Sequence, residues 1–124
     1  MILGIGCDIV CVERVERAAK NERFLVRVYT EAERTYAVQC GRAGAASLAA
    51  RFAGKEAVLK AFGTGLRGGT LHDVEILPDA LGAPEVHLYG YFAARAAEMG
   101  VTRIWITLSH EKEYATAYCM LEGQ

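Results

Sequence analysis

The segment from Ala45 to Phe62 carries the longest helical pattern in the sequence, and it constrains the fold more than any other feature. Its large apolar residues recur at intervals of four, seven and three positions, at Leu48, Phe52, Leu59 and Phe62. This spacing makes one apolar face on a helix, and the Gly63 that follows is a residue that commonly ends one. Because such a face must be buried against other elements, the sequence predicts a long central helix.

Three charged residues in the second half of that segment lie on different faces of the predicted helix. At about 100° per residue, Glu56 and Lys60 share one shoulder of the apolar face. Lys55 falls inside the apolar face, where a solvated charge is costly to bury. The presence of Lys55 there therefore requires a specific reason.

The rest of the chain divides into shorter strand-like and helix-like runs. Strands are predicted over residues 1–8, 74–77, 85–89, 104–108 and 115–121, and helices over residues 12–20, 24–28, 30–39 and 91–99. Thr30 and Glu33 form a capping box, while Gly4 and Gly6 permit close approach of another backbone. Because strands outnumber any strand–helix–strand alternation, we expect an α+β fold with a largely antiparallel sheet of about five strands around the long helix.

Size and charge restrict the classes of protein to which the chain can belong. Its 124 residues suit a single domain over residues 1–124. With 14 basic and 15 acidic side chains, it lacks the basic excess of a protein that coats nucleic acid. No apolar run approaches the roughly 20 residues that cross a membrane, and no basic residue precedes the short apolar start as in a secretory signal. We therefore expect a cytoplasmic protein that binds neither nucleic acid nor membrane.

The cysteines point to the same compartment. Cys7, Cys11, Cys40 and Cys119 are expected to be free thiols in a reducing cytosol. Cys7 and Cys11 lie four residues apart, but no other Cys or His follows closely enough in the sequence to complete a zinc site.

Two carboxylates stand out as candidates for chemistry, and each has a simpler alternative role. Asp8 ends the predicted first strand, where it either caps the following helix or points into a site. Glu56 either forms a surface ion pair with Lys60 or joins Asp8. Two carboxylates beside a cation suit Mg²⁺, which retains waters and takes further ligands from phosphate oxygens. Together these residues favour a site for a metal ion and a phosphate.

Blocks of residues along the whole chain resemble the holo-[acyl-carrier-protein] synthase family. They include Gly4-Ile5-Gly6-Cys7-Asp8-Ile9, Arg51-Phe52-Ala53-Gly54-Lys55-Glu56-Ala57, Lys60-Ala61-Phe62-Gly63-Thr64-Gly65, Gly82-Ala83-Pro84 and Leu108-Ser109-His110. The resemblance implies the 4'-phosphopantetheinyl transferase fold. It also implies transfer of 4'-phosphopantetheine from coenzyme A to a serine of apo acyl carrier protein, in fatty acid or polyketide biosynthesis, with release of adenosine 3',5'-bisphosphate. The alternative is a non-catalytic module of the same fold that binds coenzyme A or a nucleotide.

The resemblance also implies roles for individual residues. Asp8 and Glu56 would hold Mg²⁺, and Lys60 would face the coenzyme A pyrophosphate, so that these three form the catalytic set. Further contacts with coenzyme A are implied at Arg51, Lys60, Gly65, Ser109 and His110. The serine proton could pass to Glu56 or to a water associated with the metal, and the sequence leaves both open.

Carrier proteins of this kind are acidic, so a basic docking surface is expected. The residues that could form it are Arg14, Arg17, Arg23 and Arg27, although the alternative for most of them is an ordinary solvated helix. The resemblance further implies a homotrimer with each active site between neighbouring protomers. Asp8 and Glu56 would then come from one chain, and part of the coenzyme A pocket from the next.

Overall fold

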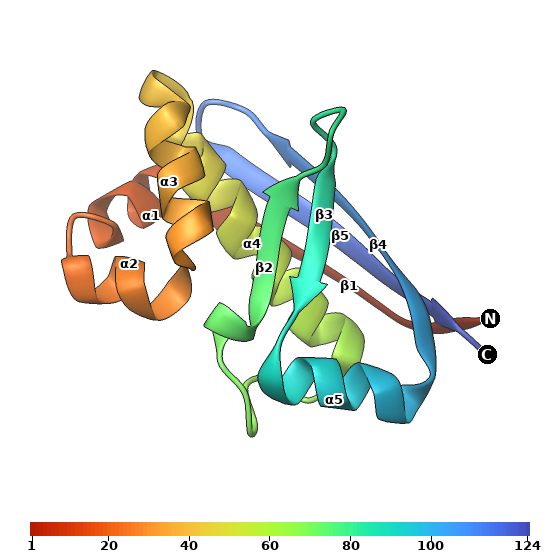
Figure 1. The fold of residues 1–124 in the computed structure, drawn as a ribbon. Helices are drawn as coiled ribbons and strands as arrows, with labels where there is room; N and C mark the ends of the chain where they lie inside the picture. The colour runs from red at the N-terminus through yellow and green to blue at the C-terminus, as the bar shows by residue number, and fades with distance from the viewer.

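The computed structural model describes all 124 residues, and its elements follow the predicted order (Figure 1). The strands are β1 (Ile2–Cys11), β2 (Val74–Pro78), β3 (Pro84–Leu88), β4 (Val101–His110) and β5 (Tyr114–Gly123). The helices are α1 (Val12–Ala18), α2 (Glu22–Val28), α3 (Glu31–Gln39), α4 (Gly44–Phe62) and α5 (Gly90–Met99), with short 3₁₀ helices η1 (Gly41–Ala43) and η2 (Leu71–Asp73). The predicted α+β fold class is confirmed.

The five strands divide between two antiparallel sheets. One sheet has the order β1-β5-β4, and the hairpin β2-β3 forms the other. The strands β1, β4 and β5 are longer than the sequence predicts. In particular, β1 does not end at Asp8, because β5 pairs with it as far as Cys11, which lies opposite Tyr114.

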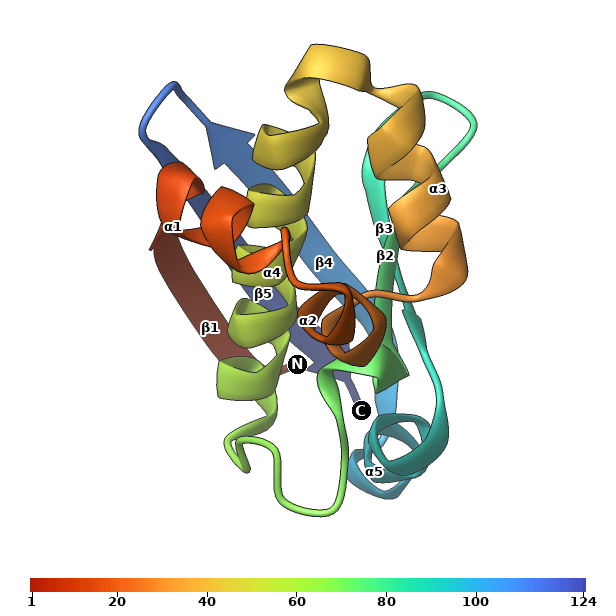
Figure 2. The ribbon, with the colours of Figure 1, turned by 90° about the vertical axis from the view of Figure 1, so that its left-hand side faces the viewer.

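Helix α4 lies between the two sheets, with β1 and β5 on one side and β2 on the other (Figure 2). A Cβ atom at Gly4 would lie 2.1 Å from the carbonyl oxygen of Ala61, and one at Gly6 would lie 2.1 Å from that of Ala57. These glycines therefore let the helix backbone rest directly on the strand, as the sequence predicts. The helix ends at Gly63, which has a φ of 77° and donates to Leu59 O and Lys60 O.

Burial of α4 extends almost all the way round the helix, because a sheet covers each side. The buried set includes small residues that the apolar pattern did not use, among them Ala49, Ala53 and Ala57. It also includes Lys55, while Lys60 at the end of the helix is exposed. A helix buried on two sides has a weak one-sided pattern, so the apolar face of Leu48, Phe52, Leu59 and Phe62 predicted the helix but not the full extent of its burial.

Two further local predictions are confirmed. The capping box at the start of α3 is present, with the Glu33 backbone N–H donating to Thr30 Oγ1 and the Thr30 N–H donating to Glu33 Oε1. All four cysteines are unpaired, and only Cys119 is buried. None of the helices is long and apolar enough to span a bilayer.

Candidate functional site

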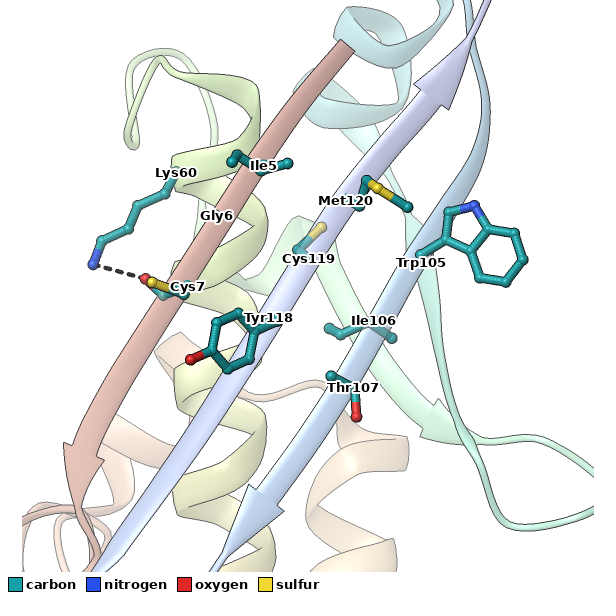
Figure 3. Close-up of a pocket in the computed structure, with 10 residues that line it drawn as sticks. All are labelled: Ile5, Gly6, Cys7, Lys60, Trp105, Ile106, Thr107, Tyr118, Cys119 and Met120. Atoms are coloured by element: carbon teal, nitrogen blue, oxygen red, sulfur yellow. Dashed lines mark hydrogen bonds between the residues drawn. The ribbon is translucent and has the colours of Figure 1, made fainter. Parts of the chain in front are cut away.

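The Asp8 carboxylate and the Lys60 ammonium meet where β1 passes the end of α4. Lys60 Nζ lies 3.2 Å from Asp8 Oδ1 and donates a second hydrogen bond of 3.0 Å to Cys7 O (Figure 3). Asp8 points to the same side of β1 as Gly6, toward α4, because side chains two apart on a strand share a face. The alternative that Asp8 caps the next helix is wrong: the N-cap of α1 is Cys11, and no side chain bonds to it.

Glu56 lies one turn before Lys60 on α4 and faces the same cluster. The simple surface pair between Glu56 and Lys60 does not form, because Lys60 turns to Asp8 instead. Burial raises the pKa of Glu56, the nearby Asp8 carboxylate raises it further, and Lys60 partly opposes both effects. The negative charges of Asp8 and Glu56 thus act on each other while Lys60 pairs with Asp8 alone, so an additional positive charge beside them would be favourable.

A cavity of about 550 Å³ opens beside this cluster. Glu56 and Lys60 line it together with residues from the end of α4 and the following loop, namely Leu59, Gly63, Gly65 and Leu66. Gly65 has a φ of 61°, which the loop needs in order to turn back over the helix end. The structure thus brings three of the predicted site residues, Glu56, Lys60 and Gly65, to one cavity.

The carboxylates of Asp8 and Glu56 suit a metal ion that takes only one or two ligands from the protein. No group of three or more His, Cys, Asp or Glu side chains lies close enough to hold a metal ion by itself. A closed structural zinc site takes four protein ligands, which Asp8 and Glu56 do not supply. Mg²⁺ usually binds through one or two carboxylates together with waters and phosphate oxygens, and this donor set suits that chemistry.

Arg51 and His110, two other predicted coenzyme A contacts, line a different cavity. Its volume is about 270 Å³, Gly82 and Pro84 also line it, and it shares no residue with the cavity beside Lys60. Arg51 lies nine residues before Lys60 on α4 and therefore faces away from it. Its guanidinium donates to Ile76 O at 3.1 Å and to Ser47 Oγ at 3.2 Å, over the ring of Tyr36. Within one chain the predicted contacts therefore form two groups.

Ser109 is separated from His110, although the two are adjacent in sequence. Successive residues of a strand point to opposite faces, so His110 lines the cavity with Arg51 while Ser109 lies exposed on the other face of the sheet. There it is paired with Thr116, which in turn lies opposite Ile9. The structure does not bring Ser109 together with the other predicted contacts.

The predicted docking arginines are all exposed on α1 and α2. These are Arg14, Arg17, Arg23 and Arg27. Arg17 lies 3.9 Å from Glu13, and both side chains are well exposed, so that pair is weak. Arg14 borders an apolar groove of about 560 Å³ that Phe24, Phe52 and Tyr114 help to line. This surface suits a partner with both acidic and apolar side chains.

A hollow of about 750 Å³ was not predicted from the sequence. It lies on the outer face of the β1-β5-β4 sheet, which no helix covers, and is mostly apolar (Figure 3). Ile5, Ile9 and Tyr118 on this face are 71%, 62% and 61% exposed. The sequence of the first strand could have indicated this exposed apolar face. Gly4 and Gly6 take positions that face the helix, so Ile5 between them must point to the other face of the sheet.

Lys55 has the specific partner that its position in the apolar face required. Its Nζ lies 2.8 Å from Glu33 Oε1, and both side chains are fully buried. Burial lowers the pKa of Lys55, and the carboxylate of Glu33 opposes that effect. Lys55 does not line the cavity that its neighbour Glu56 lines.

Comparisons with known proteins give a consistent result over the whole chain. A family model described as the 4'-phosphopantetheinyl transferase superfamily matches residues 4–119. The holo-[acyl-carrier-protein] synthase of Desulforudis audaxviator is 46% identical, over 99% of this chain and 95% of that protein. The crystal structure of holo-[acyl-carrier-protein] synthase from Neisseria meningitidis has a TM-score of 0.89 at 37% identity and covers 98% of this chain and 99% of that chain. A holo-(acyl-carrier-protein) synthase from Bacillus anthracis, in complex with CoA (3',5'-ADP), has a TM-score of 0.83 at 33% identity, covering 100% and 99%.

Proposed function

This chain belongs to the holo-[acyl-carrier-protein] synthase family of 4'-phosphopantetheinyl transferases, and we propose that the Asp8, Glu56 and Lys60 cluster is its active site. The enzyme transfers 4'-phosphopantetheine from coenzyme A to a serine of apo acyl carrier protein. One observation carries the assignment of the site: the Asp8–Lys60 ion pair lies near Glu56, beside a cavity that Glu56, Lys60 and the glycine-containing loop after α4 line. We further propose that the reaction serves fatty acid biosynthesis in the cytoplasm.

The chemistry required is a phosphodiester transfer. A bond forms between the serine oxygen and the phosphorus that carries pantetheine. The bond from that phosphorus to the bridging oxygen of the pyrophosphate breaks, and adenosine 3',5'-bisphosphate leaves. Because negative charge grows on the leaving phosphate, a fixed cation is more useful here than a covalent intermediate.

Each residue of the cluster has a task that follows from its charge. Lys60, whose ammonium Asp8 and the Cys7 carbonyl already orient, donates to the pyrophosphate. Asp8 and Glu56 would hold Mg²⁺, which when bound would neutralise phosphate charge. The proton of the attacking serine passes to a carboxylate oxygen of Glu56, which lies one turn from Lys60 at the same cavity.

The direct test is to incubate the protein with coenzyme A, Mg²⁺ and an apo acyl carrier protein, and to weigh the carrier by mass spectrometry. We expect the carrier to gain the mass of one phosphopantetheine group, and to gain nothing when its acceptor serine is replaced by alanine. Removal of Mg²⁺ with a chelator should stop the gain. A protein that binds coenzyme A but never modifies any carrier would support the non-catalytic alternative.

Two observations support assembly into a homotrimer. The outer face of the β1-β5-β4 sheet leaves a broad apolar surface uncovered, and exposed apolar patches of this kind mark protein contacts. The predicted coenzyme A contacts also divide between two cavities of one chain. We propose that a head-to-tail interface joins the Lys60 cavity of one protomer to the Arg51 and His110 cavity of the next.

The substitution Tyr118→Glu tests this assembly. It places a charge on the central strand β5, where Tyr118 lines the apolar hollow of the uncovered sheet face and desolvation of a charge is costly, so we expect light scattering to report monomers and transfer activity to be lost. The control is Val38→Glu on α3, which is 80% exposed and lies outside the sheet, and should remain trimeric and active. A monomeric wild-type protein with full activity would refute the assembly.

The substitution Arg14→Glu tests the docking surface. We expect the KM for the carrier protein to rise by about tenfold, because charge reversal on α1 repels an acidic partner, and the rise should shrink at high salt. The KM for coenzyme A should not change. Arg95→Glu makes the same change of charge on α5 and is the control. If Arg14→Glu weakened coenzyme A binding instead, Arg14 would belong to the nucleotide pocket.

A further inference from the structure

The buried pair of Lys55 and Glu33 lies outside the active-site cavity, and the transfer reaction described above makes no use of it. The Lys55 ammonium makes three contacts, with Glu33 Oε1 at 2.8 Å, with Leu71 O at 2.9 Å and with Val74 O. An ammonium has three N–H donors, so none is left over. Lys55 is therefore fully engaged in holding other parts of the chain.

Glu33 connects this ammonium to two further elements. Its Oε2 accepts a 2.8 Å hydrogen bond from the backbone N–H of Ile76 on β2, and its Oε1 accepts one from Thr30 at the start of α3. A second buried carboxylate, Glu75, accepts from the Thr30 hydroxyl at 2.6 Å and from the Tyr89 hydroxyl at 3.2 Å. No buried side-chain nitrogen or oxygen lacks a partner. The network thus ties α3, α4 and β2 together through directional bonds.

Stability alone is a poor reason for such a network. Burying two opposite charges costs several kcal/mol per ion in desolvation, and well-packed apolar side chains of similar volume often do as well or better. Hydrogen bonds also fix the positions of particular backbone atoms, which apolar packing does not do. The relevant atoms are the carbonyl oxygens of Leu71 and Val74, at the two ends of the 3₁₀ turn η2.

The turn η2 follows directly on the loop of residues 63–70, whose Gly63, Gly65 and Leu66 line the cavity beside Glu56 and Lys60. Three glycines of this loop have positive φ, and its one internal backbone hydrogen bond runs from Gly69 N to Leu66 O. At its returning end the Thr70 N–H donates to Asp73 Oδ2. The loop begins at Gly63, which is fixed as the C-cap of α4. Leu71 directly follows the loop, and its carbonyl oxygen is bound by Lys55.

We propose that Lys55 is a positioning residue, which with Glu33 fixes the returning end of the loop 63–70 relative to the catalytic face of α4. This inference rests on the proposed function of the cavity. Lys55 and Glu56 are adjacent on one helical turn, and their side chains diverge by about 100°. The same turn of helix therefore supplies the active-site carboxylate on one side and the loop anchor on the other.

The test uses the double variant Lys55→Met/Glu33→Gln, which removes both charges of the pair together. Trypsin reports on the loop, because Arg67 is the only Lys or Arg between Lys60 and Arg95. We expect cleavage after Arg67, giving fragments 1–67 and 68–124, to be about tenfold faster than in the wild type well below the melting temperature. The KM for coenzyme A should rise by about tenfold, with kcat changed less than about threefold, because Asp8, Glu56 and Lys60 remain in place.

The control is Tyr29→Phe, which removes a buried 2.8 Å hydrogen bond to Leu48 O in the same helix without touching the loop. It should lower the melting temperature while cleavage after Arg67 and the KM for coenzyme A stay at wild-type values. If the double variant does not fold, Glu33→Gln alone, which keeps the shape of the side chain, should show the same two changes at smaller size. Wild-type rates of cleavage after Arg67 in a folded variant would overturn the proposal. Faster cleavage in a protein whose wild type transfers nothing would leave the anchor standing and refute the proposed function.

Discussion

Replacement of Asp8 by asparagine is expected to lower the rate of phosphopantetheine transfer by about 100-fold to 1,000-fold. Asparagine keeps the size and one oxygen of the side chain but removes the negative charge. That charge orients Lys60 across 3.2 Å and forms one half of the carboxylate pair with Glu56. The variant therefore removes one proposed metal ligand and the ion pair that fixes Lys60, the proposed active-site cation, in one step.

The measurement is steady-state transfer at saturating Mg²⁺ and coenzyme A, with the melting temperature recorded alongside. The side chain of Lys60 is 56% exposed, so the ion pair contributes little to folding and the melting temperature should change by only a few degrees. Asp79→Asn, in the turn between β2 and β3, is the matched control and should keep its activity. Near wild-type turnover in Asp8→Asn would contradict the assignment of Asp8 to the active site.

The largest expected effect on folding comes from Gly6→Ala. A Cβ atom at this position would lie 2.1 Å from the carbonyl oxygen of Ala57 and 2.7 Å from the backbone nitrogen of Ala61. Neither backbone can move aside, because β1 is paired with β5 along its length and α4 is enclosed by both sheets. We expect a loss of about 3 kcal/mol or more, a large part of the stability of a small domain.

Thermal and urea unfolding measure this effect. We expect the melting temperature of Gly6→Ala to fall by more than about 10 °C. The control is Val38→Ala on α3, whose side chain is 80% exposed and lies away from the sheet, so the stability should change little. A melting temperature for Gly6→Ala within about 2 °C of the wild type would mean that the helix does not rest on the strand as described.

Much of the architecture could be predicted because its signals are local. The glycine after Phe62 that ends α4 and the capping box of Thr30 and Glu33 each depend on neighbours within a few positions. Periodicity also gave the number and order of the strands. The predicted ends of the strands were less accurate, because pairing with β5 extends β1 to Cys11.

The relations between distant residues depended on the packing of whole elements. The sequence left two roles open for Asp8, a helix cap or a site residue. It also left open whether Glu56 pairs with Lys60 or joins Asp8. Both questions were answered only by the approach of β1 to the end of α4, 52 residues away along the chain. A periodic pattern shows which side of an element is buried, but the partner across the interface comes from the tertiary structure.

Lys55 shows the same division most clearly. Its position in the apolar face of α4 is a property of the helical period, so the sequence alone marked it as anomalous. Its partner, Glu33, lies on another helix, and the carbonyl groups of Leu71 and Val74 that it also binds lie beyond a glycine-rich loop. Local spacing therefore determined that Lys55 is buried, whereas only the docking of α3, α4 and β2 decided what neutralises its charge, because that depends on contacts between segments far apart in the chain.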